Sequence, residues 1–157
     1  MTHEKTELTV AGIIEFAVHI EEESARYYET AITKYLKNND DELIELLEDL
    51  SLEEIKHKKR LMDRFQVIPE ASRSIASPEL QNTVDMLVSI PEPADDASVE
   101  DILHIALLRE NSTRDLYARL LSLSELGYLA DVFEELVDQE AGHARRIQSM
   151  LNKRTKE

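Results

Sequence analysis

Two segments of the sequence each place a glutamate three residues before a histidine: Glu54 with His57, and Glu140 with His143. Residues three apart on a helix lie on the same face, so each pair would present a carboxylate and an imidazole to one point. Carboxylate oxygen and imidazole nitrogen are ligands that suit iron and manganese. The chain contains no cysteine, so a metal bound here must be held by oxygen and nitrogen.

Two single glutamates, Glu21 and Glu110, complete this set of candidate ligands. Each interrupts a stripe of apolar residues that recur at steps of three and four, which is the pattern of a helix face turned toward a core. An unpaired carboxylate in a core costs several kcal/mol, so these positions need a partner there. The four carboxylates and two neutral imidazoles together carry a charge that two divalent cations would cancel.

The candidate ligands repeat within the chain. The Glu-x-x-His pair that begins at Glu54 recurs at Glu140, an offset of 86 residues, and Glu21 recurs as Glu110, an offset of 89 residues. In each half, the single glutamate and the Glu-x-x-His pair are about equally far from the turn between them. At a rise of about 1.5 Å per residue, they reach the same level. We therefore expect all six side chains to meet in one layer.

Long helices are predicted to position this layer. The 157 residues include 3 glycines and 4 prolines, and all the prolines lie in the segment 66–97. Short turns at Asn38–Asn39 and Gly127 predict two antiparallel hairpins. The segment 66–97 is predicted to cross over along the bundle, with a short helix within ELQNTVDMLVSI. The expected fold is a single all-α domain, with helices at about 7–37, 40–65, 98–124 and 128–153.

Composition excludes several classes of function. The chain has 18 Lys and Arg against 33 Asp and Glu, a net charge of −15, which repels nucleic acid and anionic membranes. No apolar run approaches the roughly 18 residues of a membrane span. The N-terminal sequence MTHEKTEL lacks the basic and apolar regions of a signal peptide, so a cytoplasmic protein is expected.

The four helical segments resemble the rubrerythrin branch of the ferritin-like superfamily of di-iron and di-manganese carboxylate proteins. In that superfamily two helices of a bundle each supply a glutamate, and two supply Glu-x-x-His. The resemblance covers all four predicted helices and leaves out the crossover and the termini. It is carried by the segments AVHIEEESARYY, LEEIKHKKRL, ALLRENSTRDLY and LVDQEAGHARRI.

The resemblance implies a role for each candidate residue. Tyr28 and Tyr117 correspond to tyrosines that the family keeps beside its site, where each would hydrogen-bond a ligand carboxylate and orient it. The implied ligand set has Glu54 and Glu140 bridging two metals, Glu21 and Glu110 as terminal ligands, and His57 and His143 on one metal each.

The implied function is a di-iron oxidoreductase that acts on hydrogen peroxide or dioxygen, with manganese or a mixed metal pair as alternatives to two iron ions. Rubrerythrins also carry a cysteine-ligated iron domain, so in a chain without cysteine the electrons would come from a separate redox protein. Rubrerythrins also place an additional glutamate three residues after the ligand that corresponds to Glu110, and this chain has Thr113 at that position. A homodimer is the expected oligomer.

Two other functions fit the same residues. A ferroxidase or iron-storage role, as in ferritins, would use the same centre but needs a closed shell of many subunits. A non-catalytic bundle stabilised by metal, which docks a partner through its acidic surface, would bind metal without turnover.

Overall fold

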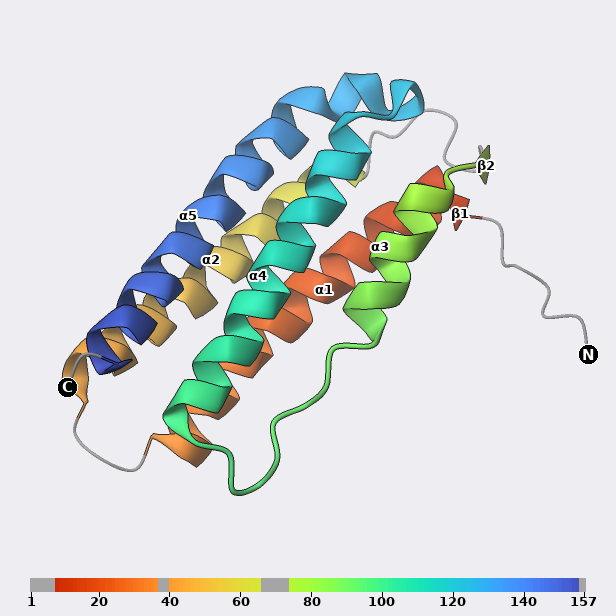
Figure 1. The fold of residues 1–157 in the computed structure, drawn as a ribbon. Helices are drawn as coiled ribbons and strands as arrows, with labels where there is room; N and C mark the ends of the chain where they lie inside the picture. The colour runs from red at the N-terminus through yellow and green to blue at the C-terminus, as the bar shows by residue number, and fades with distance from the viewer. Residues whose placement is uncertain (1–7, 37–39, 66–73, 156–157) are drawn as a thin grey trace, which may run out of the picture.

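The computed structural model describes residues 8–36, 40–65 and 74–155 and confirms the all-α prediction. Its long helices lie close to the predicted ranges, and a shorter helix, α3, lies inside the predicted crossover (Figure 1). Among the described residues, no helix combines the length and the apolar composition that a membrane crossing requires. The helices are α1 (Val10–Thr30), α2 (Asp41–Phe65), α3 (Pro78–Val88), α4 (Val99–Leu121) and α5 (Ala130–Thr155).

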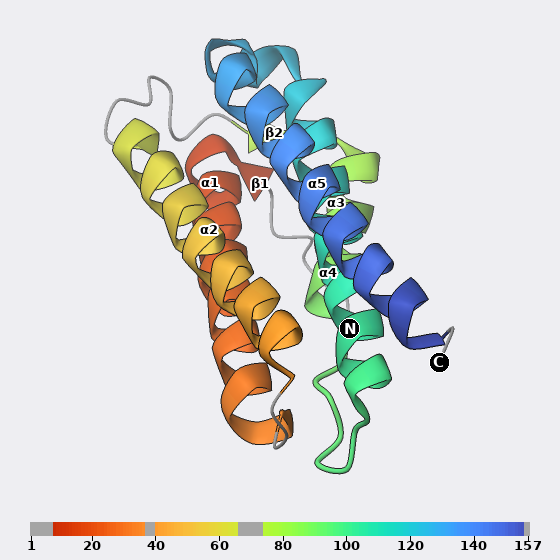
Figure 2. The ribbon, with the colours of Figure 1, turned by 90° about the vertical axis from the view of Figure 1, so that its left-hand side faces the viewer.

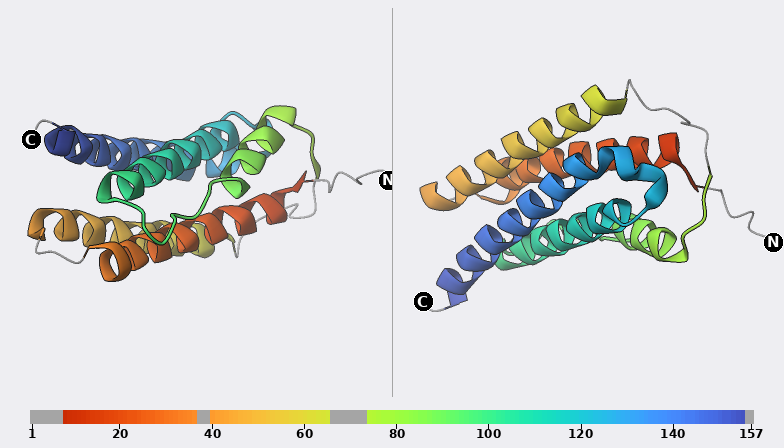
Figure 3. Two further views of the ribbon diagram at one scale, coloured as in Figure 1. Left: turned by 60° about the horizontal axis from the view of Figure 1, so that its bottom comes forward. Right: turned by 90° about the horizontal axis from the view of Figure 1, so that it is seen from above.

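The long helices form two antiparallel hairpins that lie face to face. Helix α1 runs beside α2, and α4 runs beside α5 (Figure 2). Seen along another direction, α4 and α5 make one layer and α1 and α2 the other, with α3 against α4 (Figure 3). The crossover brings the chain back along the bundle, so α4 starts near the end at which α2 starts (Figure 1).

Side-chain caps fix where two of these helices begin. The Ser98 hydroxyl accepts a hydrogen bond from the Asp101 backbone N–H, and the Asp101 carboxylate accepts one from the Ser98 N–H, both at 3.1 Å. This reciprocal cap satisfies two N–H groups that α4 would otherwise leave without a partner. Helix α3 begins in a similar way, because Ser77 accepts from the Leu80 N–H and Pro78 occupies the first helical position.

The ends of the elements differ from the predictions in three places. Before α1, the strand β1 (Leu8–Thr9) pairs antiparallel with β2 (Ser74–Ile75), an element that was not predicted. After α1, the chain forms a π-helical turn, η1 (Ala31–Tyr35). Between α4 and α5 lies a 3-10 segment, η2 (Ser124–Leu129), kinked at Leu126, so α5 starts two residues later than predicted. The predicted turn at Asn38–Asn39 lies outside the described residues.

A row of ion pairs joins α2 to α5 across the two hairpins. Their partners advance along α2 as they go back along α5, which fixes the two helices as antiparallel neighbours. These pairs are largely exposed, so each contributes at most about 1 kcal/mol. They are Glu42–Lys153, Asp49–Arg146, Arg60–Glu135 and Arg64–Asp131.

The apolar core is divided into two clusters. One contains Ile20 of α1 and Leu136 of α5, and the other contains Tyr28 of α1 and Ile147 of α5. On each long helix, the residues between the two clusters are the buried polar ones. The fold therefore has a polar layer across its middle, closed above and below by apolar packing.

Candidate metal centre

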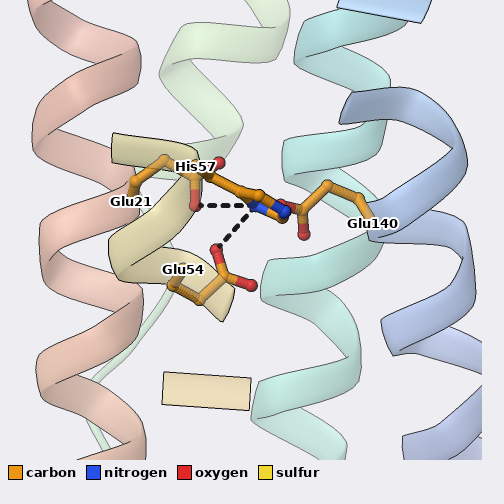
Figure 4. A group of neighbouring side chains, drawn as sticks. All are labelled: Glu21, Glu54, His57 and Glu140. Carbon is orange, nitrogen blue, oxygen red and sulfur yellow. Dashed lines mark hydrogen bonds and ion pairs between the residues drawn. The ribbon is translucent and has the colours of Figure 1, made fainter. Parts of the chain in front are cut away.

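The structure brings together all six side chains that the sequence nominated, at one level between the two hairpins. Each helix of the bundle contributes, so the centre depends on the packing of all four. Figure 4 shows four of the six turned toward one another from α1, α2 and α5. The exposed fractions are 0% for Glu21, 1% for Glu54, 4% for His57, 2% for Glu110, 1% for Glu140 and 4% for His143.

The six residues form two overlapping groups, each of which offers four ligand atoms within 4.8 Å of one another. The first group is completed by Glu21 and His57, and the second by Glu110 and His143. Both groups contain Glu54 and Glu140, which lie between the other ligands. This arrangement is the one that two neighbouring ions with two shared carboxylates would require.

The two histidines make matching contacts across the hairpins. Nδ1 of His57 and Glu140 Oε1 form a hydrogen bond of 2.9 Å, and Nδ1 of His143 and Glu54 Oε1 form one of 2.8 Å. Their rings are stacked, with centroids 5.4 Å apart and planes 11° from parallel. Both Nδ1 atoms therefore face the carboxylates, as the internal repeat requires.

The tyrosines named from the resemblance also lie at the centre, and each donates a hydrogen bond to a glutamate of the opposite hairpin. Tyr28 of α1 donates its hydroxyl hydrogen bond to Glu110 of α4. Tyr117 of α4 donates to Glu21 Oε1 of α1 at 2.5 Å. Burial, and then the neighbouring carboxylates, raise the pKa of both phenols above the usual value, so they stay protonated and keep donating.

Three buried carboxylate oxygens at the centre have no hydrogen-bond partner among the described residues: Oε2 of Glu21, of Glu110 and of Glu140. The nearest imidazole nitrogens lie 3.4 to 3.7 Å from them without forming a hydrogen bond. A buried acceptor without a partner costs free energy, more so when it is charged. Carboxylates and imidazoles with such free lone pairs fit divalent cations, because the ions would supply the missing partners.

With protein groups alone, protons must balance the charge of the centre. Burial, followed by the other carboxylates, raises the pKa of Glu54 and Glu140 well above the usual range. Burial also opposes ionisation of Glu110, but the polar groups of Glu140 and His143 beside it outweigh burial and lower its pKa to about 2. Burial disfavours the charged form of His143, yet the nearby carboxyl groups of Glu110 and two further glutamates raise its pKa to about 12.

The other half of the centre behaves in the same way. Burial opposes ionisation of Glu21, but the polar groups of Glu54 and His57 beside it hold its pKa below the usual value. Burial disfavours the imidazolium of His57, and hydrogen bonds to Glu140 and the other carboxylates raise its pKa nonetheless. The pKa shifts thus favour imidazolium ions that face the carboxylates of Glu21 and Glu110, with protons retained on the shared glutamates. Cations that displaced these protons would keep the layer neutral.

The structure also shows three features beside the centre, of which the recess and the contact of Glu53 were not predicted from the sequence. A recess of about 890 Å³ lies between α2 and α5, with both histidines on its wall and Lys56, Lys59 and Arg145 among its lining residues. Glu53 lies at its edge, where Oε2 is 2.5 Å from Nε2 of His143. Thr113, at the position of the additional rubrerythrin glutamate, is 2% exposed and donates its hydroxyl to the Arg109 carbonyl oxygen at 2.8 Å.

The fold defined by these helices is a ferritin-like helical bundle, as the resemblance implied. Among solved structures, the chain is similar to a protein of Thermotoga maritima described as a ferritin-like diiron-carboxylate protein. The TM-score is 0.72 at 19% sequence identity, and the match covers 95% of this chain and 98% of that chain. A scan against models of protein families and a search of curated proteins find no match.

Proposed function

We propose that this chain is a rubrerythrin-like di-iron carboxylate oxidoreductase that reduces hydrogen peroxide or dioxygen. The observation that carries the proposal is the pair of overlapping four-ligand groups, buried in the polar layer and sharing Glu54 and Glu140. Ligands of oxygen and nitrogen type favour iron, and manganese or a mixed pair would fit the same donors. When bound, two ferrous ions supply two electrons, which with two protons convert peroxide to two molecules of water.

The chain's own residues hold, neutralise and enclose the centre. Glu54 and Glu140 would bridge the ions, while Glu21 with His57 and Glu110 with His143 would each complete one metal position. The two tyrosines would orient the terminal carboxylates through their hydroxyls. The apolar clusters on both sides of the layer limit access of water to it.

Electrons would come from a separate redox protein, because the chain has no cysteine with which to hold an iron cluster of its own. The recess between α2 and α5 supports this view, since it brings solvent to the outer edges of both imidazoles. Each imidazole would then lie between a metal position and a docked donor. Redox chemistry could thus occur without opening the bundle.

The test is metal analysis of protein purified without oxygen, followed by a rapid-mixing challenge with hydrogen peroxide or dioxygen. We expect two iron ions per chain and fast oxidation of the ferrous form. The double variant Glu54→Ala with Glu140→Ala should lose most of the metal, and full metal content in that variant would refute the assignment. The matched control is Glu22→Ala with Glu23→Ala, adjacent carboxylates of α1 outside the centre, which should keep both ions.

The same preparation separates the two alternative functions. Tightly held metal that does not react with peroxide would indicate a non-catalytic, metal-stabilised bundle. A large multi-subunit shell by size-exclusion and light scattering would favour iron storage, whereas a homodimer is expected for the oxidoreductase.

A further inference from the structure

The two histidines differ in the contacts that their outer nitrogens make. At the offset of 86 residues that relates His57 to His143, Glu53 corresponds to Gln139. Glu53 Oε2 accepts from His143 Nε2 at 2.5 Å. Gln139 instead donates its amide to Glu135 at 3.2 Å, and Nε2 of His57 has no hydrogen-bond or ion-pair partner among the described residues.

Some of the other outer residues are equivalent in kind, whereas Lys56 and Asp63 correspond to Gly142 and Ser149. Arg60 and Arg146 occupy corresponding positions, and so do their acidic partners, Glu135 and Asp49. Arg60 lies 2.5 Å from Glu135, and Arg146 lies 3.2 Å from Asp49. Glu53, which also pairs with Arg146 at 3.5 Å, is therefore a carboxylate that contacts one imidazole from outside, where the other half has an amide that bonds elsewhere.

We propose that Glu53 makes the two metal positions unequal, so that the position held by His143 fills first and binds its ion more tightly. This inference rests on the proposed metal-binding function. A hydrogen bond from Nε2–H to a carboxylate fixes the tautomer that leaves the Nδ1 lone pair for the metal, and it makes that nitrogen a stronger donor. Its Nδ1 already faces the shared carboxylates. Glu53 is a positioning residue, because it acts through His143.

The expected ratio of the two metal affinities follows from the general effect of hydrogen bonds to the outer nitrogen of a ligand histidine. Their removal costs about 10-fold to 100-fold in metal affinity. The side chain of Glu53 is 41% exposed, which places the expected ratio of the two affinities near the lower end of that range. The exposure also means that substitutions at this position leave the packed core unchanged.

The experiment is a titration of chelator-treated protein with zinc, which is diamagnetic and does not change oxidation state. Isothermal calorimetry should resolve two steps whose affinities differ by about 10-fold or more. At one equivalent of zinc, ¹⁵N NMR of the histidine side chains should show coordination of Nδ1 at His143 before His57. Glu53→Gln should weaken the first step until the two steps merge. Gln139→Glu should strengthen the second step by a similar factor.

Asp49→Asn is the matched control, because Asp49 is the other acidic partner of Arg146, and its substitution removes the same charge as Glu53→Gln without removing a contact to His143. It should leave both steps unchanged. Equal zinc occupancy at the two histidines at one equivalent would overturn the inference. So would the same change in the first binding step in Asp49→Asn as in Glu53→Gln. In both cases, two bound ions would still support a metal centre. Failure to bind two ions at all would count against the proposed function itself.

Discussion

Glu54 and Glu140 need different protonation states when the centre holds metal and when it does not. As shared metal ligands they would be ionised, whereas burial and the other carboxylates raise their pKa values and favour the neutral form in protein without metal. The raised pKa values of the two imidazoles favour their protonated form as well. Metal binding would release these protons, so metal affinity should rise with pH.

The same pKa shifts set the pH dependence of stability without metal. An unfolded glutamate ionises near pH 4.5, but folded Glu54 and Glu140 hold their protons above that value. The folded state binds more protons, so its stability falls as the pH rises above about 4.5. His143 adds a loss of the same sign between pH 6.5 and about 12. Glu110 acts in the opposite sense, and its contribution is lost as the pH falls from 4.5 to about 2.

We therefore expect chelator-treated protein to be most stable near pH 5 and to lose melting temperature steadily toward pH 8. Calorimetric scans across this range measure the effect. The double variant Glu54→Gln with Glu140→Gln removes the two buried acids, so it should melt at least about 2–4 °C higher than wild type at pH 8 without metal, which corresponds to about 1 kcal/mol. A wild-type melting temperature that rises from pH 5 to pH 8 would contradict the assignment.

Tyr28 offers a second test at the residue scale, with its neighbour as the control. Tyr28→Phe removes the donor to Glu110 and should lower the free energy of unfolding by about 1.5–3 kcal/mol, because that acceptor is charged. Metal affinity should fall as well, since a ligand carboxylate loses its orientation. Tyr27 donates to the Ile102 carbonyl oxygen at 2.6 Å, so Tyr27→Phe should cost about 1 kcal/mol and leave metal affinity unchanged. Urea denaturation and zinc titration measure both quantities.

The sequence predicted which residues meet at the centre because helical spacing and the internal repeat determine that outcome. It did not reveal Glu53, which lies one position before Glu54 and therefore points about 100° away from the ligand face. A half-exposed glutamate on a charged helix has the pattern of a solvated surface. The available signal was the mismatch with Gln139 in the repeat, which becomes informative only once the contact with His143 is known.

At the scale of elements, the long helices were predictable and their connections were not. Periodic apolar residues define α1, α2, α4 and α5 over many turns, so errors are confined to their ends. The pairing of β1 with β2 joins two-residue segments that are too short to show a period. The 3-10 segment η2 has 6 residues, which is also too short to show a helical period.

The start of α4 can be tested by itself, because the reciprocal cap of Ser98 and Asp101 is exposed and remote from the centre. Ser98→Ala should lower the free energy of unfolding by about 1 kcal/mol, with a range of about 0.5–2 kcal/mol. Urea denaturation provides the measurement. Ser122→Ala, which removes an exposed hydroxyl bonded to the Arg119 carbonyl oxygen near the other end of α4, should cost less. An equal loss in both variants would show that the cap has no special role.

At the scale of the whole molecule, the polar layer couples the two hairpins. The two tyrosines and two histidines of the centre each contact a glutamate of the other hairpin. Ions in the layer would therefore stabilise the association of the hairpins as well as the centre. The apolar clusters on either side of the layer then determine how much structure persists without the ions.

Metal removal should accordingly lower the stability of the entire bundle. Each ion present at 100 times its dissociation constant adds about 2.7 kcal/mol, which corresponds to roughly 5–10 °C in melting temperature for a chain of this size. Calorimetry with and without a chelator measures the difference. In the Glu54→Gln with Glu140→Gln variant the chelator should have no effect, and a wild-type melting temperature unchanged by the chelator would exclude a structural contribution from metal.

The exchange of contacts between hairpins also has an evolutionary consequence. One hairpin with a single glutamate, a tyrosine and a Glu-x-x-His pair carries half of a complete centre, and two copies of it related by a twofold axis would supply the whole. Duplication and fusion of a gene for such a hairpin would produce a chain with this repeat. Glu53 and Gln139 would then mark where the two descendants diverged, each free to specialise for its own ion.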